Sequence, residues 1–160
     1  MNSIVRFLSQ TTDSFFLFGP RGTGKTTWLK MNYKNSIYID FLSTRAYIEY
    51  SSDPEKLKEL VAGNPTVKTF ILDEVQRIPE ILTIVHQLIE VDKDLQFVLT
   101  GSSARKLKQT GIDLLAGRAI LKKCYPFMAS ELGDGFNLEQ ALLHGMIPLI
   151  LMSAHPEEAL

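Results

Sequence analysis

The stretch GPRGTGKTT, residues 19–27, follows the apolar run FFLF and precedes the amphipathic segment WLKMNYK. Gly19, Gly24, Lys25 and Thr26 satisfy the spacing G-x-x-x-x-G-K-[ST] of a phosphate-binding loop. That motif belongs between a strand and a helix, and both flanking segments have the required character. A glycine-rich turn that carries Lys-Thr by chance would not need this placement. The sequence therefore predicts a nucleotide site here.

The loop's chemistry suits an anion. Its glycines let successive backbone N–H groups converge on one point, and the following helix adds its unpaired N–H groups and positive dipole end. We expect Lys25 to reach the β- and γ-phosphates and to act in catalysis, and the Thr26 hydroxyl to ligate Mg²⁺. Thr27 would approach the α-phosphate. The predicted nucleotide-binding residues are Gly19, Pro20, Arg21, Gly22, Thr23, Gly24, Lys25, Thr26 and Thr27.

Composition points to one ordinary globular domain. The 160 residues are 45% hydrophobic and 22% charged, with a net charge of -1, so no global polycation argues for nucleic acid. The single cysteine, Cys124, excludes an internal disulfide, and we interpret it as a small core residue in a reducing cytosol. No signal-peptide pattern opens the chain, and the apolar run at 146–152 is too short for a membrane span. We expect a cytoplasmic protein without a membrane partner.

Apolar runs alternate with amphipathic stretches along the chain. Five runs rich in Ile, Val, Phe and Tyr predict strands, and segments of helical spacing between them predict helices. Strands that are apolar on both faces and separated by helices indicate an α/β fold, here a three-layer P-loop NTPase fold with a five-stranded, mostly parallel sheet covered on both faces. The predicted strands are 15–19, 36–40, 69–74, 95–102 and 119–125, and the helices are 25–32, 53–62, 79–91, 103–109 and 137–145. Asp53 is expected to cap the second helix and Pro79 to open the third, and Asn137 and Gly145 are expected to cap and to end the last.

An acidic pair ends the third predicted strand. Asp73 would lie beside the phosphate loop at the carboxyl end of the sheet and would hold Mg²⁺ through water. Glu74 points elsewhere and would act as the general base on an attacking water. A small-molecule kinase needs no such glutamate, and the guanine-reading tetrapeptide N-K-x-D is missing. The pair therefore favours ATP hydrolysis over a capping or surface role.

The fourth predicted strand ends in hydroxyl residues. If it lies between the strands of the phosphate loop and of Asp73, Thr100 or Ser102 would face the γ-phosphate and sense it, with Thr100 as a catalytic residue. Helix capping near Ser103 is the alternative, and both roles are compatible. Arg118, before the fifth strand, is a candidate for stabilising charge on the γ-phosphate, in its own chain or in a neighbouring subunit. A salt bridge would explain it equally well.

Cations are concentrated between residues 103 and 123. A nucleic-acid surface is one interpretation, and a solvated face is the commoner meaning of such a run. The aromatic residues lack the interleaved pattern of a base-stacking platform, and we expect them in the core. The cations are Arg105, Lys106, Lys108, Arg118, Lys122 and Lys123.

Six segments resemble, in order, a prokaryotic group of AAA-type P-loop ATPases in which the ATPase module precedes a C-terminal domain of unknown function. They are GPRGTGKTT, IYID, ILDEVQRIPE, VLTGSSARKL, LLAGRA and YPFMASEL. The resemblance covers about residues 13–132. It implies ATP and Mg²⁺ as ligands, Gly19 to Thr27 on phosphate, Asp73 on Mg²⁺, Glu74 as the catalytic acid with Gln76 nearby, and Thr100 to Ser103 as a sensor segment. Met146 departs from the group, in which a second glycine is common.

We divide the chain into an ATPase domain, residues 1–132, and the start of a truncated helical region, residues 133–160. Two functions fit. The first is an Mg²⁺-dependent ATPase that couples hydrolysis to a conformational change, an attached domain or an unknown protein partner, with oligomerisation open. The second is a nucleotide-dependent switch with little hydrolysis, for which DNA is one candidate partner. We expect the isolated chain to bind ATP and to hydrolyse it slowly.

Overall fold

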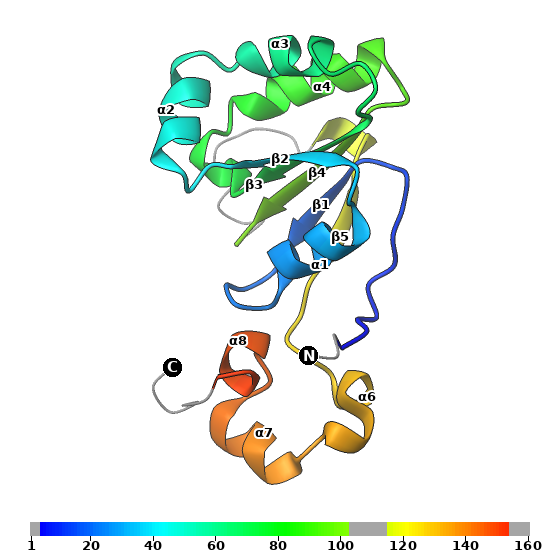
Figure 1. Cartoon of the computed structure of the whole chain (residues 1–160), viewed down its shortest axis with the longest axis vertical. Coiled ribbons are helices and arrows are strands. Elements are labelled where there is room, and N and C mark those ends of the chain that lie inside the picture. Colours follow the sequence, from blue (N-terminus) through cyan, green and yellow to red (C-terminus); the bar gives the residue numbers. More distant parts are fainter. Residues whose placement is uncertain (1–3, 103–114, 154–160) are drawn as a thin grey trace.

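The computed structural model of the chain describes residues 4–102 and 115–153. Within them, five strands form one sheet in the order β2-β3-β4-β1-β5 (Figure 1). All neighbouring strands pair in parallel. The five-stranded α/β sheet is therefore confirmed, and β4 lies between β1 and β3, the condition on which the prediction for Thr100 and Ser102 rests. The strands are β1 Phe15–Phe18, β2 Ser36–Asp40, β3 Thr69–Asp73, β4 Gln96–Gly101 and β5 Ile120–Lys123.

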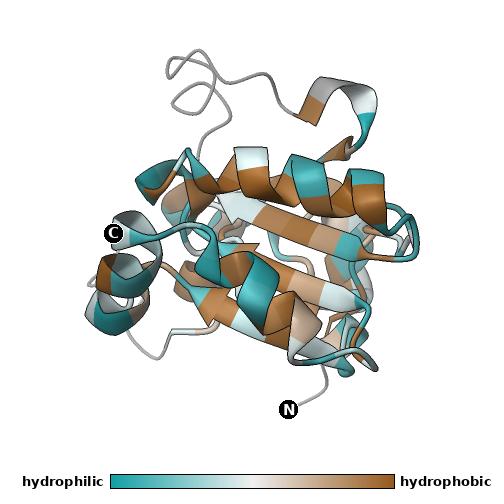
Figure 2. Ribbon diagram, turned by 90° about the horizontal axis from the view of Figure 1, so that it is seen from above, coloured by the Kyte–Doolittle hydropathy of each residue, from teal (hydrophilic) through white to brown (hydrophobic). Residues whose placement is uncertain are grey.

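Helices cover both faces of this sheet and continue beyond it (Figures 1 and 2). Helix α1, Lys25–Asn32, lies on one face, and α2 Thr44–Ser52, α3 Lys56–Ala62 and α4 Ile81–Val91 lie on the other. After β5 come α6 Ala129–Leu132, α7 Leu138–His144 and α8 Pro148–Leu151. Three short 3₁₀ turns complete the list: η1 Val75–Arg77, η2 Leu115–Gly117 and η3 Gly133–Gly135.

Alternate strand residues enter two separate cores. Phe16, Phe70 and Phe97 belong to the core under α2, α3 and α4, whereas Phe15 and Val98 pack beside Trp28 and Leu29 of α1. Parallel strands buried on both faces are expected to be mainly apolar, as are β1 and the Phe97–Leu99 part of β4. Figure 2 shows the apolar sides of the helices turned toward the sheet. The helices thus bury the two faces of the sheet, and the carboxyl ends of its strands are where a ligand site can form.

Two helix predictions need correction. Helix α2 was not predicted, since its segment TRAYIEYSS is rich in β-branched and aromatic residues and buries only Tyr50 among its members. Asp53 was expected to cap the next helix, but it ends α2, and its carboxylate accepts a hydrogen bond from the Glu55 N–H (3.1 Å) in the turn before α3. Helix α4 likewise begins at Ile81, two residues after Pro79. The predicted helix 103–109 lies outside the described residues.

The C-terminal segment contains the expected helix and one that contacts the phosphate loop. The Asn137 side chain caps α7 by accepting from Gln140 N–H (3.0 Å), and Gly145 ends it with φ 75°, as predicted. Helix α8 then lies against the loop, where the Leu149 N–H donates to the Gly22 carbonyl (3.3 Å). Among the described residues, no helix has the length and apolar character needed to cross a membrane.

The close packing of Gly19 against β5 gives a stability test. A Cβ on Gly19 would lie 2.1 Å from the Cys124 carbonyl oxygen, which is backbone and cannot turn aside, whereas a Cβ on Gly135 would meet nothing within 4 Å. We expect Gly19→Ala to lower the free energy of unfolding by about 2 kcal/mol, the usual cost of overpacking. Urea denaturation of both variants measures this. Equal stability of Gly19→Ala and Gly135→Ala would contradict the packing described.

Candidate functional site

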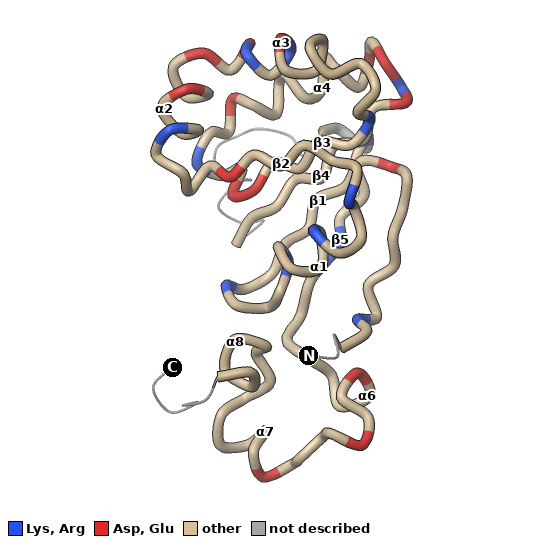
Figure 3. Tube along the Cα trace, in the orientation of Figure 1, with Lys and Arg blue, Asp and Glu red and all other residues tan. Residues whose placement is uncertain are grey.

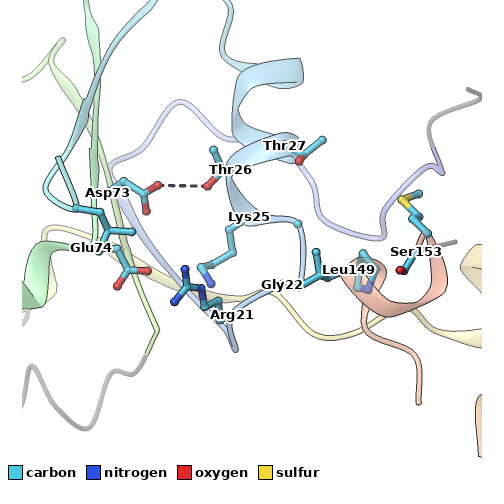
Figure 4. A pocket seen from close by; sticks show the side chains of 13 residues that line it. Arg21, Gly22, Lys25, Thr26, Thr27, Asp73, Glu74, Leu149 and Ser153 are labelled. Carbon is cyan, nitrogen blue, oxygen red and sulfur yellow. Dashed lines mark hydrogen bonds between the residues drawn. The ribbon is translucent and has the colours of Figure 1, made fainter. Parts of the chain in front are cut away.

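The loop after β1 and the first turn of α1 surround a cavity of about 670 Å³ (Figure 4). We call this the main cavity. Gly22 (φ 82°) and Gly24 (φ 85°) adopt left-handed backbone conformations that favour glycine. Gly24 is also the N-cap of α1, and no side chain caps the helix there. The first N–H groups of α1 therefore have no partner within the helix, and the positive end of its dipole lies at the cavity.

The predicted loop residues divide into those that line the cavity and those that shape the loop. The first group is Arg21, Gly22, Gly24, Lys25, Thr26 and Thr27. Thr23 is fully buried, and its hydroxyl donates to the Pro20 carbonyl (2.8 Å), which closes the turn. Gly19 is fixed by its contact with Cys124. Gly19, Pro20 and Thr23 are outside the cavity's lining and act through the fold of the loop.

Lys25 is a buried cation at this cavity, with 8% of its surface exposed. Its ammonium donates to the carbonyls of Gly19 (2.6 Å) and Pro20 (3.0 Å). None of the ion pairs formed by the described residues includes Lys25. A buried charge is costly unless an opposite charge accompanies it. A buried ammonium beside open helix N–H groups is therefore a site for an anion.

Asp73 supplies the opposite charge across the cavity. Its carboxylate is 7% exposed, at the end of β3. It accepts hydrogen bonds from the hydroxyls of Thr26 (3.2 Å), Tyr38 and Thr100. The structure thus brings Thr26 and Asp73 together, as Figure 4 shows. A hydroxyl and a carboxylate are hard oxygen donors of the kind that Mg²⁺ prefers.

Glu74 lines the main cavity from a strained backbone position. Its φ of 61° and ψ of 47° lie in the left-handed region, which costs a non-glycine residue roughly 1–2 kcal/mol. The Gln76 amide donates to the Glu74 carboxylate and, at 3.4 Å, to the Ser102 hydroxyl. The buried Gln76 carbonyl oxygen has no hydrogen-bond partner. The strained backbone thus belongs to Glu74, the residue predicted to be the general base, and the unsatisfied oxygen to Gln76, whose amide holds the Glu74 carboxylate.

Thr100 forms hydrogen bonds with both members of this acidic pair, Asp73 and Glu74. It is fully buried and does not line the main cavity. Its hydroxyl donates to Asp73 and accepts the Glu74 N–H (3.2 Å), which holds the left-handed turn in place. That Thr100 or Ser102 faces a γ-phosphate stays a prediction; in the structure the Thr100 hydroxyl contacts Asp73 and Glu74, and the Ser102 hydroxyl contacts Gln76. Ser103 lies outside the described residues.

Arg118 does not reach this cavity. It precedes β5, whose first residue Ile120 pairs with Phe15 at the start of β1, so Arg118 lies at the edge of the sheet opposite the phosphate loop. Its guanidinium donates to the Glu90 carboxylate at the end of α4. This hydrogen bond, with a second from Lys93, lowers the pKa of Glu90. The salt bridge expected as one alternative for Arg118 is present.

Sequence reasoning missed Arg6, which ties three segments together behind the loop. Its guanidinium donates to the Thr23 carbonyl (3.0 Å) and to the Glu131 carboxylate (3.1 Å), and it lies 4.7 Å from the centroid of the Phe127 ring. The side chains of Arg6 and Glu131 are 11% and 3% exposed. Nothing in the local sequence marks Arg6, since all of its partners are distant along the chain.

A second, smaller cavity adjoins the first. Its volume is about 200 Å³, and it shares Gly24, Thr27, Pro148 and Met152 with the main cavity. The remaining wall is mostly apolar and comes from the N-terminal segment, α1 and the region after β5, with Ile4, Val5, Arg6, Trp28, Met31, Asn32 and Phe127. The cavity that contains Lys25 and Asp73 thus adjoins one whose remaining wall is mostly apolar.

The comparisons with known proteins agree with this geometry. A sequence model of the AAA domain matches residues 11–133. The chain belongs to this AAA domain family. The resemblance to AAA-type P-loop ATPases inferred from the motifs is thereby confirmed. A search of curated proteins gave no match.

Among solved structures, the ORC1 protein of Aeropyrum pernix in complex with DNA is similar, with a TM-score of 0.51 and 15% identity over 78% of this chain. This chain spans 42% of that ORC1 chain. AMPPCP-bound DnaA from Aquifex aeolicus gives a TM-score of 0.48 and 19% identity, over 92% of this chain and 57% of that one. Domain III of DnaA from Thermotoga maritima gives a TM-score of 0.46 and 15% identity, over 88% of this chain and 68% of that one. At these identities, the ORC1 likeness shows the fold alone.

The buried hydroxyl of Thr100 can be tested by an isosteric change. Thr100→Val keeps the shape but removes one hydrogen bond to a carboxylate and one from a backbone N–H, so we expect a loss of about 2 kcal/mol in unfolding free energy. Thr83→Val on the exposed side of α4 is the control, since the two residues have similar helix propensity. Urea denaturation compares them. A Thr100→Val protein as stable as the control would show that the hydroxyl is not the anchor described.

Proposed function

We propose that the chain binds ATP with Mg²⁺ in the main cavity and is an Mg²⁺-dependent ATPase. The observation that carries the proposal is the presence, in one cavity, of the buried Lys25 ammonium, which makes no ion pair among the described residues, and of the Thr26–Asp73 contact. The first favours a polyphosphate and the second a hard divalent cation. Membership of the AAA domain family supports the same pair of ligands.

The residues present fit both ligands. Lys25 and the open N–H groups of the first turn of α1 would hold the β- and γ-phosphates, with Gly22 and Gly24 allowing close backbone approach. Thr26 would ligate Mg²⁺ and Asp73 would hold it through water. Among the described residues, no group of three or more His, Cys, Asp or Glu side chains could hold a metal ion. This suits Mg²⁺, which commonly combines one or two carboxylates with substrate phosphates and water.

The adjoining apolar cavity would take the base. Trp28 and Phe127 are among its lining residues, and aromatic side chains suit a flat heterocycle. The missing N-K-x-D tetrapeptide argues against a guanine-reading site, so adenine is the proposed base. The base would then contact the N-terminal segment, α1 and α8 together.

Binding is tested at the buried cation. Lys25→Ala removes the ammonium that faces the phosphates, and we expect at least a tenfold loss of ATP affinity, since hydrogen bonds to charged groups contribute about 1.5–3 kcal/mol. Lys34→Ala, at an exposed lysine just beyond α1, is the control. Isothermal titration calorimetry with ATP and Mg²⁺ measures both. Equal affinity of Lys25→Ala and wild type would refute the assignment.

For hydrolysis, Glu74 is the proposed general base. Its carboxylate lines the main cavity, and Gln76 and Thr100 fix its side chain and its backbone. Arg21 lines the same cavity and, with Lys25, would neutralise charge developing on the γ-phosphate (Figure 4). Arg118 lies at the opposite edge of the sheet, so a role for it requires a neighbouring subunit's site. A γ-phosphate arginine supplied by another chain contributes roughly 10³–10⁵ in rate, which is why we expect slow turnover by the isolated chain.

The acid pair gives a test of hydrolysis. Glu74→Gln keeps the shape of the side chain and removes its basicity, so we expect ATP affinity within about twofold of wild type and turnover lower by about 10²-fold or more. Asp73→Asn, in contrast, should weaken Mg²⁺-dependent ATP binding. Steady-state phosphate release and calorimetry on the same preparations measure the two effects. Undiminished hydrolysis by Glu74→Gln would exclude Glu74 as the base.

A nucleotide-dependent switch is the second candidate. One observation in its favour is that the Glu74 carboxylate already accepts a hydrogen bond from the Gln76 amide. Another is that α8 contacts Gly22 of the phosphate loop and would move when nucleotide binds there. A protein partner, an attached domain built on residues 133–160, or oligomerisation would receive that signal. The discriminating measurement is turnover by wild type. Vigorous hydrolysis without any partner would favour the enzyme, and stable ATP binding without hydrolysis would favour the switch.

DNA is the partner proposed for the switch on weaker grounds. Figure 3 shows cationic residues prevailing around α1 and β5, whereas both signs mix along α2, α3 and α4. The similar ORC1 protein was solved in complex with DNA, but its likeness to this chain extends to the fold alone. Repeating the turnover measurement with and without DNA tests this partner. Stimulation that disappears at high salt would support it, because phosphate contacts are strongly salt-dependent.

A further inference from the structure

Tyr38 lies beside the metal-site carboxylate, on a strand that carries no recognised motif. In the β2–β3 register, Tyr38 pairs with Ile71 and Asp40 pairs with Asp73. Side chains alternate along a strand, so Tyr38 and Asp73 point to the same face of the sheet. That face is covered by α1, since Ile71 and Tyr38 pack in the core of Trp28 and Leu29. The Tyr38 hydroxyl there donates a hydrogen bond to Asp73 Oδ2.

Three hydroxyls thus converge on one buried carboxylate. Asp73 Oδ2 accepts from Tyr38 of β2 and Thr26 of α1, and Oδ1 accepts from Thr100 of β4. An ionised carboxylate has about four acceptor positions, so one position on Oδ1 is left for a further donor. Because the donors come from three separate elements, they fix the plane of the carboxylate as well as its position. Of the three, only Thr26 belongs to the phosphate-loop motif.

We propose that Tyr38 is a positioning residue for the Mg²⁺ site, acting through Asp73. Its hydroxyl holds the carboxylate in the plane that faces Thr26, so that both oxygens needed by the cation are oriented before it binds. The inference rests on the proposed function and adds a residue to its metal site. Hydrogen-bond partners of metal-site carboxylates commonly affect metal affinity by 10–100-fold.

The surroundings of Tyr38 separate this role from simple packing. The ring is held by the core beside α1 and by the Lys30 ammonium, 5.2 Å from its centroid, and neither contact uses the hydroxyl. Tyr33 packs against the same core, but its hydroxyl contacts the backbone of Thr11. The two tyrosines are therefore matched in packing and differ in what their hydroxyls bind.

The test compares Tyr38→Phe with Tyr33→Phe. For each, calorimetry measures ATP affinity in EDTA and over a series of free Mg²⁺ concentrations. We expect Tyr38→Phe to raise the Mg²⁺ concentration at half-maximal effect about tenfold, and to leave the affinity in EDTA within about twofold of wild type. Tyr33→Phe should leave both values unchanged. A purely structural role of Tyr38 would move the affinity in EDTA as well, since it would disturb the phosphate loop.

A double variant shows whether Tyr38 acts through Asp73. Asp73→Asn with Tyr38→Phe should lose no more Mg²⁺ dependence than Asp73→Asn alone, because the positioned group is already changed. Fully additive losses, or an Mg²⁺ midpoint that Tyr38→Phe leaves unchanged, would overturn the inference while the proposed function stands. A wild-type chain that binds ATP without any Mg²⁺ dependence would overturn the proposed metal site, and the inference with it.

Discussion

The Asp73 carboxylate joins more of the structure than any neighbouring side chain of the site. It ends β3 and accepts hydroxyls from β2, β4 and α1, so four elements are fixed relative to one another at the carboxyl edge of the sheet. A carboxylate buried this far is tolerated only when its acceptor positions are satisfied. The hydroxyls that offset the cost of burying this carboxylate also orient it toward Thr26. Stability and the geometry of the metal site therefore have one cause.

Strand order makes this convergence possible. Because β4 lies between β1 and β3, one strand separates the phosphate loop from the acidic pair. Thr100 of that strand forms hydrogen bonds with both Asp73 and Glu74. The interposed strand also leaves an opening above it, since the loop after β1 and the turn at Glu74 diverge there. A ligand at this edge meets a cation on one side and carboxylates on the other. The electrostatic asymmetry of the main cavity thus follows from the topology.

The sequence predicted what depends on neighbours along the chain. The phosphate loop, the strand that ends at Asp73 and the capping of α7 by Asn137 each have a local pattern, and the structure places them accordingly. The role of Tyr38 could not be predicted, because it depends on the β2–β3 register. The role of Arg6 could not be predicted either, because its partner Glu131 is more than 100 residues away along the chain. The sequence placed Thr100 correctly at the end of β4, but the partners of its hydroxyl depend on the turn at Glu74. Helix α2 could not be predicted from burial, because Tyr50 is its one buried member and Ala46 and Tyr47 are only partly buried beside it.

The two halves of the proposed nucleotide site consequently differ in origin. The side chains proposed to bind phosphate and Mg²⁺ come from the loop, α1 and β3, all within the residues that match the AAA domain, whereas the rest of the main cavity's lining includes Pro148, Leu149, Met152 and Ser153 from after it. The apolar half takes Ile4 to Arg6 from before that match, and Pro148 and Met152 from after it. Arg6 connects the halves, since it holds the Thr23 carbonyl of the loop and the Glu131 carboxylate of α6. A ligand that fills both halves would therefore link the N-terminal segment and α8 to the phosphate loop, which gives the terminal segments a direct physical route for sensing it.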